Sequence, residues 1–240
     1  MSIRYATVDN FEGWEKALGA ISKIALSANS RNILEIGAGA NPTLPVSFIK
    51  THGIDYTTND ISSEELLKAA PDYKRLCFDF SEGTPPDELK GKYDLVFSRM
   101  VNEHVRNGQQ YYRNILAVLQ RGGITAHWFS TLYAFPFLVN KVVPDGFSEM
   151  FLYMFSPRDR FQHDKFRAYY SWGRGPTVTM QTRFSQLGFE IIEYIGYFGH
   201  TYYKNRLPLL HRLELQKAQY LAKHPVPQLT SYACVILKKK

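Results

Sequence analysis

The sequence predicts an α/β fold with a doubly wound, mostly parallel sheet of seven strands, and three observations predict it. Strand-like apolar runs alternate with helical patterns as far as about residue 130, the order that places helices on both faces of a parallel sheet. Two later strand-like runs, joined by a connection, predict an antiparallel edge on this parallel sheet, with the last strand antiparallel. The 240 residues suffice for one large domain, 1–240, with a cap inserted into it.

The elements before residue 131 follow from apolar spacing and from residues that end helices. Apolar side chains at helical spacing predict an opening helix over 10–28, and Gly53 and Pro71 end the next two helices. A further helix is expected to stop at the glycine pair 122–123. The sequence thus predicts strands at 31–37, 54–60, 75–80, 92–100 and 123–131, and helices at 10–28, 44–53, 62–70 and 108–123.

Two insertions interrupt this alternation. Residues 131–176 form a long aromatic segment with two proline-containing stretches, which we expect to be a cap over the site. Residues 200–228 form a helical insertion before the last strand, with a basic amphipathic helix at 207–224 that has Pro208 near its start. A helix at 180–190 and strands at 189–199 and 229–239 complete the expected fold.

The formal charge of +7 is unevenly distributed. Residues 1–130 carry a net charge of −1 and residues 131–240 a net charge of +8. The neutral part therefore predicts a scaffold, and the basic, aromatic part predicts contact with an anionic, sugar-like or lipid-like group. A basic surface that only keeps the protein soluble is the alternative.

Cysteine content and the opening residues indicate the compartment. Cys77 and Cys234 both lie in strand-like runs, which predicts two reduced thiols in the core. The opening residues lack the apolar stretch of a signal peptide, and no run is long and apolar enough to span a bilayer. We therefore expect a cytoplasmic protein. Because residues 131–240 are basic, peripheral contact with a membrane surface is an alternative.

A strand runs into a glycine-rich turn at residues 33–42, "ILEIGAGANP". Glycines let the backbone approach a ligand closely, as at nucleotide sites. Pro42 stands where a dinucleotide-binding loop has its third glycine, which argues against a pyrophosphate ligand. Glu35, two residues before Gly37, suits a cationic ligand instead. S-adenosylmethionine carries a sulfonium and an ammonium group and has no phosphate.

The segment "LEIGAGANP" resembles the first motif of class I S-adenosylmethionine-dependent methyltransferases, in their small-molecule, type 11-like branch. "YDLVFSRMVNEHV" is similar to the fourth-strand motif of that branch, and "LQRGGITAHWFS" resembles the unit that follows it. The resemblance covers about residues 30–130 and implies a Rossmann-like fold with S-adenosyl-L-methionine as the cofactor. It departs from the family pattern at Pro42, Asn59 and Arg99.

The resemblance also implies which residues contact the cofactor. Asp60 would bind both ribose hydroxyls, and Asp79 would bind the adenine amino group with Phe80 beside the ring. The full implied set is Glu35, Gly37, Ala38, Gly39, Asn41, Asp60, Ile61, Asp79, Phe80, Ser98 and Arg99. Structural alternatives stay open: Asp60 as the cap of the helix at Ser62, Asp79 as a turn residue, and Glu35 as an acceptor for loop N–H groups.

Methyl transfer to a hydroxyl is helped by a general base. Sites in such sheets lie beyond the carboxyl ends of the strands, which makes His127 and His104 the candidate catalytic residues. The alternatives are a core histidine at position 127 and a structural one at position 104. Glu103 with His104 could hold a divalent cation, but no further well-spaced ligand is visible, so we expect no metal.

The acceptor is expected to contact aromatic and basic residues of the cap, because rings stack on sugars and arginines bind phosphate or carboxylate. We predict O-methylation of a small or carrier-linked metabolite such as a sugar in glycan or natural-product biosynthesis. Alternatives are an N-methyltransferase, a nucleic-acid methyltransferase, or a catalytically silent S-adenosylmethionine-binding partner protein. "SRMV" stands where base-methylating enzymes carry Asn/Asp-Pro-Pro-Tyr, which argues against nucleic acid. The candidate substrate residues are Trp128, Tyr133, Arg167, Tyr170, Trp172 and Arg174.

Overall fold

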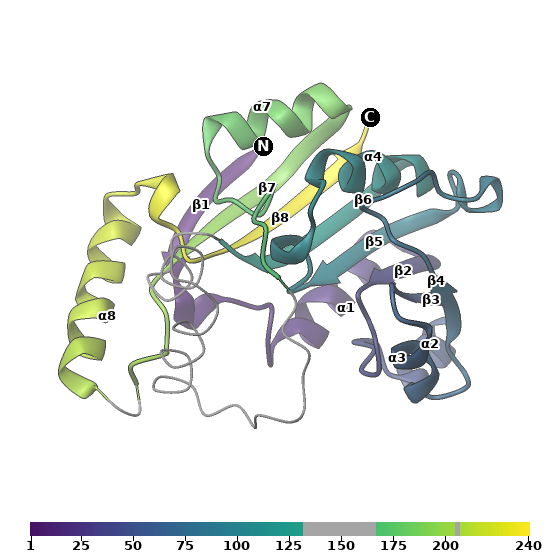
Figure 1. Ribbon diagram of the computed structural model, residues 1–240, viewed down its shortest axis with the longest axis horizontal. Helices are drawn as coiled ribbons and strands as arrows, with labels where there is room; N and C mark the ends of the chain where they lie inside the picture. Colours follow the sequence, from purple (N-terminus) through teal and green to yellow (C-terminus); the bar gives the residue numbers. More distant parts are fainter. Residues whose placement is uncertain (132–166, 205–206) are drawn as a thin grey trace.

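The computed structural model describes residues 1–131, 167–204 and 207–240, which form an eight-stranded sheet with helices on both faces (Figure 1). The strands are β1 (Ser2–Thr7), β2 (Asn32–Ile36), β3 (Asp55–Asp60), β4 (Lys74–Cys77), β5 (Tyr93–Arg99), β6 (Leu119–Ser130), β7 (Phe189–Phe198) and β8 (Tyr232–Lys239). Their order across the sheet is β1-β7-β8-β6-β5-β2-β3-β4. β8 is antiparallel to both of its neighbours, and the other pairings are parallel.

The helices form two layers and one separate element (Figure 1). The α-helices are α1 (Ala17–Ser27), α2 (Val46–His52), α3 (Ser63–Lys68), α4 (Gly108–Val118), α7 (Val178–Leu187) and α8 (Pro208–Lys223). Short 3₁₀ helices are η1 (Val8–Asn10), η2 (Asp87–Leu89), η3 (Asn102–His104) and η4 (Pro227–Leu229). Residues of α4 and α7 share one core cluster, and residues of α1 and α2 share the other. α8 lies apart from both layers, against β1 and β7.

Burial on both faces explains why the central strands read as continuous apolar runs. Leu34 and Val96 face the cluster of α4 and α7, whereas Ile33, Leu95 and Phe97 face that of α1 and α2. Neighbouring residues on a strand point to opposite faces of the sheet. A polar side chain in these strands therefore points to the face opposite that of its immediate neighbours along the strand.

The sequence prediction missed β1, and the sheet has eight strands where seven were expected. β1 pairs in parallel with β7 over its whole length, from Ser2 opposite Glu193 to Thr7 opposite Phe198. Its residues are mostly half-buried, as at a sheet edge. β8 is antiparallel as expected, and it lies with β7 on the far side of β6, where the unpredicted β1 adds one further strand at the edge.

The boundary between α4 and β6 also differs from the prediction. The helix ends at Val118, and β6 begins at Leu119 rather than after the glycine pair 122–123. The register with β5 shifts there, because Tyr93 pairs with Leu119 and Leu95 with Ile124. The glycines thus belong to an irregularity in the strand and do not end the helix.

Both cysteines are free, but only one is in the core. Cys234 is buried in β8, whereas Cys77 ends the edge strand β4 and is exposed. The expectation of two core thiols therefore holds for Cys234 alone. The difference arises because an edge strand has only one hydrogen-bonded neighbour to cover it.

Candidate cofactor and acceptor site

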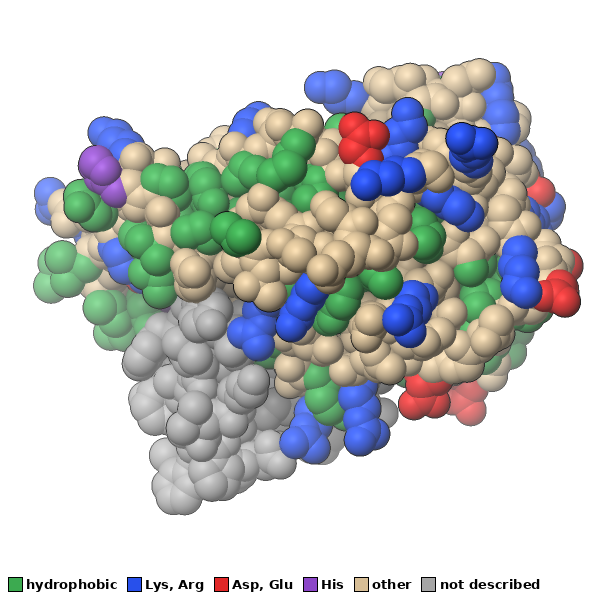
Figure 2. Space-filling model, turned by 90° about the horizontal axis from the view of Figure 1, so that it is seen from above, with side chains coloured by type: hydrophobic (Ala, Val, Ile, Leu, Met, Phe, Trp, Pro, Cys, Tyr) green, Lys and Arg blue, Asp and Glu red, His purple; other side chains and the backbone are tan. Residues whose placement is uncertain are grey.

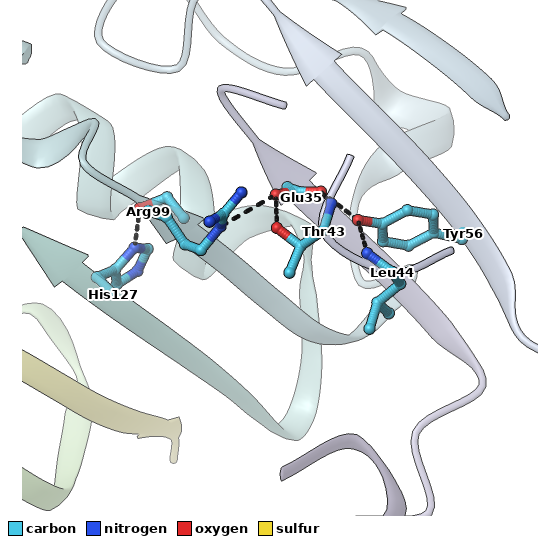
Figure 3. A network of polar contacts seen from close by, with 7 residues as sticks. Glu35, Thr43, Leu44, Tyr56, Arg99 and His127 are labelled. Atoms are coloured by element: carbon cyan, nitrogen blue, oxygen red, sulfur yellow. Dashed lines mark hydrogen bonds and ion pairs between the residues drawn. The ribbon is translucent and has the colours of Figure 1, made fainter. Parts of the chain in front are cut away.

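A buried carboxylate fixes the loop after β2 (Figure 3). Glu35 is 2% exposed and accepts hydrogen bonds from the Thr43 N–H at 2.8 Å, from the Thr43 hydroxyl and from the Tyr56 hydroxyl. Its Oε1 lies 3.8 Å from Arg99 Nε. Burial raises the pKa of Glu35, while the bonds from Thr43 and Tyr56 and the charge of Arg99 oppose that rise. These protein groups therefore hold Glu35 as an anchor of the loop.

Two glycines let this loop pass through a narrow space. Gly37 has a φ of 73° and Gly39 a φ of 48°, which side chains other than glycine rarely adopt. A Cβ on Gly37 would lie 2.3 Å from Val101 Cγ2, and one on Gly39 would lie 3.4 Å from Asp60 Oδ2. The glycine loop is therefore packed between the segment after β5 and the carboxylate that ends β3.

Asp60 and Asp79 follow neighbouring strands, β3 and β4. Oδ1 of Asp60 accepts the Ser62 N–H at 3.0 Å, and Oδ1 of Asp79 accepts the Ser81 N–H at 2.7 Å. Each aspartate thus makes a local turn bond, as the structural alternative for Asp79 requires. The helix cap considered for Asp60 is instead made by Ser62, whose hydroxyl accepts the Glu65 N–H at 3.2 Å. Both side chains are partly exposed, and neither bond involves Oδ2.

Asn59, which the sequence marked only as a departure from the family pattern, has a positioning role. Its buried amide donates to the carbonyls of Leu76 at 2.8 Å and Phe78 at 2.9 Å. The backbone carbonyl of Asn59 accepts the Ala38 N–H at 2.9 Å. Asn59 therefore ties the end of β4, just before Asp79, and the glycine loop to β3. No distinct signal in the sequence marked this role, because β3, DYTTND, is polar along most of its length.

The remaining residues of the implied cofactor set are distributed around the same edge. Ile61 is 59% exposed, Asn41 is exposed, and Phe80 is buried edge-on to Phe78 with ring centroids 5.1 Å apart. The strands β4, β3, β2 and β5 are consecutive in the sheet and parallel. Their carboxyl ends therefore bring the two aspartates, the glycine loop and Arg99 to one edge.

His127 does not reach this edge, which contradicts its prediction as the base. The ring is fully buried, with Nδ1 2.7 Å from Ser98 Oγ and Nε2 2.6 Å from Thr125 Oγ1. Tyr111 and Tyr112 of α4 pack edge-on against it. Burial lowers the pKa of His127 to about 3. Both nitrogens are thus occupied by core hydroxyls, and the residue is a neutral core histidine.

Glu103 in η3 brings a second buried carboxylate to the carboxyl end of β6. It is 3% exposed, and its Oε1 accepts the Ser130 hydroxyl at 3.0 Å. Its Oε2 has no hydrogen-bond partner within residues 1–131, 167–204 and 207–240. Burial raises the pKa of Glu103, and it is also the main reason why the pKa values of Tyr170 and Tyr232 are raised, to which the charge of Glu103 adds. A carboxylate, a serine and two tyrosines therefore lie close together here.

The segment 167–176 packs onto this cluster and does not stand off as a lid. The N–H groups of Tyr169 and Tyr170 donate to the Glu103 carbonyl at 2.8 and 3.0 Å. Tyr170 is 4% exposed and has a φ of 50°. Sparsely populated backbone conformations of this kind concentrate at functional sites. Tyr170, predicted from the sequence as a substrate residue, therefore lies beside Glu103. Cap residues 132–166, Tyr133 among them, lie outside the described residues.

Trp172 and Trp128 are core residues, which contradicts their prediction as substrate contacts. Trp172 stacks on Tyr112 with ring centroids 5.6 Å apart, and a Cβ on Gly108 would lie 2.4 Å from its ring. Trp128 is 1% exposed in the cluster of α1 and α2. The aromatic richness of this region therefore reflects core packing at these two positions.

Arg167, Arg174 and His104 remain predicted site residues. Arg167 is exposed, and its guanidinium lies 5.5 Å from the centre of the Tyr169 ring. His104 is exposed, with Nδ1 3.3 Å from the Arg167 carbonyl oxygen. Arg174 is half-buried. Within the described parts of the chain, no group of three or more His, Cys, Asp or Glu side chains could hold a metal ion.

Comparisons with known proteins identify the architecture. Residues 34–125 match the sequence profile of a methyltransferase domain. The fold resembles phosphoethanolamine N-methyltransferase 2 of Haemonchus contortus, solved with phosphomonomethylethanolamine and S-adenosylhomocysteine, at a TM-score of 0.57 and 14% identity. An S-adenosylmethionine-dependent methyltransferase from Mesorhizobium loti matches at 0.51 and 17%, and a methyltransferase domain of citrinin polyketide synthase at 0.53 and 14%. No curated protein sequence matches the chain.

The matches cover nearly all of this chain but differ in how much of the other protein they cover. The aligned part is 94% of this chain and 53% of the Haemonchus protein, 96% and 99% for the Mesorhizobium protein, and 94% and 51% for the citrinin domain. The chain thus spans about half the length of the first of these proteins. At these identities the likeness concerns the fold.

We predict that His127→Gln makes folding stability less dependent on pH. His127 has a lowered pKa when folded, so the unfolded chain binds the extra proton as the pH falls below about 6.5. The wild type should therefore lose about 2 kcal/mol between pH 7.5 and pH 5 through this group, a loss that the variant lacks. Urea unfolding of both proteins at the two pH values measures the difference. Equal pH dependence would contradict the assignment.

We also predict that Trp172→Ala destabilises the fold by about 3–5 kcal/mol, because it leaves a cavity between α4 and α7. Tyr169→Ala removes a neighbouring ring that is 37% exposed and should cost less than about 1 kcal/mol. Chemical denaturation of the two variants gives the comparison. Wild-type stability of Trp172→Ala would return Trp172 to the list of candidate substrate contacts.

Proposed function

Because residues 34–125 match the profile of a methyltransferase domain, we propose that the chain is a class I S-adenosylmethionine-dependent methyltransferase that methylates a hydroxyl group of a small or carrier-linked metabolite, such as a sugar in glycan or natural-product biosynthesis. The observation that supports this most is the pairing of two features at the sheet's carboxyl edge. One is the glycine loop with Asp60 and Asp79. The other is the half-satisfied, buried carboxylate of Glu103.

The residues present fit S-adenosyl-L-methionine, which when bound supplies an electrophilic methyl group on a sulfonium. Asp60 Oδ2 lies next to Gly39 of the glycine loop and is suited to accept hydrogen bonds from ribose hydroxyls. Asp79 at the next strand end is suited to an amino group of the adenine. The anchor made by Glu35 and Arg99 keeps the glycine loop in the conformation that this fit needs.

Glu103 is suited to the role of general base that His127 cannot fill. A hydroxyl acceptor must lose its proton as its oxygen takes the methyl group, and Oε2, which no group in the described parts of the chain hydrogen-bonds, has lone pairs to accept that proton. Burial makes this carboxylate more basic than one in water. Ser130 and the backbone of Tyr169 and Tyr170 hold η3 in place. His104, next in the chain and exposed, is the second candidate base.

Methylation of an amine is a second candidate, because Glu103 lies beside tyrosine rings. A carboxylate with aromatic faces is a typical binding site for an ammonium group. The Tyr170 N–H donates to the Glu103 carbonyl, and Tyr232 pairs with Ser130, whose hydroxyl donates to the Glu103 carboxylate. A panel of sugars, phenols and primary to tertiary amines, assayed with isotopically labelled S-adenosylmethionine, separates the two. Cofactor binding with no transfer to any compound would favour the silent binding protein.

We predict that Asp60→Ala weakens the binding of S-adenosylhomocysteine at least tenfold. Hydrogen bonds to charged groups are worth roughly 1.5–3 kcal/mol each, and the variant loses the acceptor for both ribose hydroxyls. Titration calorimetry measures the affinity. The control is Asp72→Ala, which removes an exposed aspartate that pairs with Lys50 at 2.7 Å. An affinity within twofold of the wild type in Asp60→Ala would remove Asp60 from the cofactor site.

We predict that Glu103→Gln lowers kcat by roughly 10²–10⁴-fold for a hydroxyl acceptor identified in the panel, since it removes the base. Its affinity for S-adenosylhomocysteine and its thermal midpoint should stay near those of the wild type, because the amide can still accept from Ser130. Glu82→Gln, at an exposed glutamate, is the control. Unchanged turnover in Glu103→Gln would shift the role of the base to His104, which His104→Ala then tests.

A further inference from the structure

α8 has two different apolar faces. Its inner face carries Ala218 and Leu221, at 0% and 8% exposure, which pack with Phe198 of β7. The contact is close, because a Cβ on Gly199 would lie 2.9 Å from Ala218 Cβ. Glu214 is also buried on this side, with Lys217 Nζ 2.5 Å from its Oε2. These contacts fix the helix on the edge of the sheet and use its inner face completely.

The outer face of α8 is apolar and exposed. Leu209, Leu213 and Tyr220 are 80%, 61% and 64% exposed. Their spacings of four and seven residues place them on one stripe of the helix. Leu210, exposed at 42%, widens the stripe at its start. In Figure 2, apolar side chains gather at the end of the molecule where α8 lies in Figure 1, among basic side chains and one histidine.

The charges beside this stripe are of one sign. Arg212 and Lys223 lie on one side of it and Lys217 on the other, and all three side chains are exposed. The single carboxylate of α8 is Glu214, which faces inward and is buried. The exposed surface of the helix therefore combines leucine and tyrosine side chains with cations and has no acid.

We propose that α8 binds the protein to an anionic lipid surface, lying in the plane of the headgroups with Leu209, Leu213 and Tyr220 inserted. Such helices have an apolar face for the acyl boundary and flanking Lys and Arg for anionic headgroups. The charge complementarity favours lipid over a second copy of this chain, because two copies of α8 face to face would bring like charges together. None of the helices in the described residues meets the length and apolarity that a membrane span requires.

Vesicle flotation of the full chain tests the proposal. In 0.1 M salt, the protein should bind vesicles of three parts phosphatidylcholine to one part phosphatidylglycerol at least about tenfold better than pure phosphatidylcholine vesicles. The double variant Leu209→Glu, Leu213→Glu should lose this binding. The double variant Leu18→Glu, Leu26→Glu, at exposed leucines of α1, should keep it. The double variant Arg212→Gln, Lys223→Gln should bind the anionic vesicles more weakly, and its binding should depend less on the salt concentration.

The outcomes that overturn the proposal are separate from loss of fold. Circular dichroism and the thermal midpoint of each variant, together with its affinity for S-adenosylhomocysteine, show that the fold is intact. Absence of wild-type binding to the anionic vesicles, or equal binding by the Leu209→Glu, Leu213→Glu variant, refutes the lipid surface. A concentration-dependent dimer in sedimentation analysis that this variant abolishes would assign the stripe to a second copy instead.

Discussion

The geometry of the cofactor edge depends on one buried carboxylate. Glu35 sits inside the sheet layer, where an isolated charge would be strongly disfavoured, and three neighbouring groups from different parts of the chain compensate it. Thr43 comes from the far end of the glycine loop, Tyr56 from β3 and Arg99 from the end of β5. The same contacts that satisfy the charge therefore fix the loop relative to three adjacent strands.

The remaining parts of the site follow from that alignment. With the loop held, Gly39 lies against Asp60, and Gly37 lies against Val101. Val101 immediately precedes η3, so the glycine loop packs against the residue next to the helix that carries Glu103. The two carboxylates differ in how they are satisfied: Glu35 accepts several hydrogen bonds, whereas Oε2 of Glu103 has no hydrogen-bond partner within residues 1–131, 167–204 and 207–240. A saturated charge stabilises structure, and an unsaturated one is available for chemistry.

Much of this could be predicted from the sequence because the signals are local. The alternation of strands and helices, the glycine loop and the acids at two strand ends all depend on short stretches of residues. The role of His127 could not be predicted, because β6 is buried on both faces and its apolar pattern does not indicate which face a histidine takes. Pairing with Ser98 places His127 on the face of α4, away from Glu35. Trp172 was misassigned for a related reason: a ring looks the same in sequence whether it contacts Gly108 or a ligand.

The position of β8 has a consequence for how the protein is made. β7 and β1 are connected to the rest of the sheet only through β8, the last strand in the described chain. During synthesis, β6 emerges before Tyr232–Lys239, the segment with which it pairs in the finished sheet. An unpaired edge beside an apolar core is a template for aggregation and a natural target for chaperones. The sheet is therefore completed only after Tyr232–Lys239 has been synthesised, so yield in cells should depend on how well the open edge of β6 is protected until then.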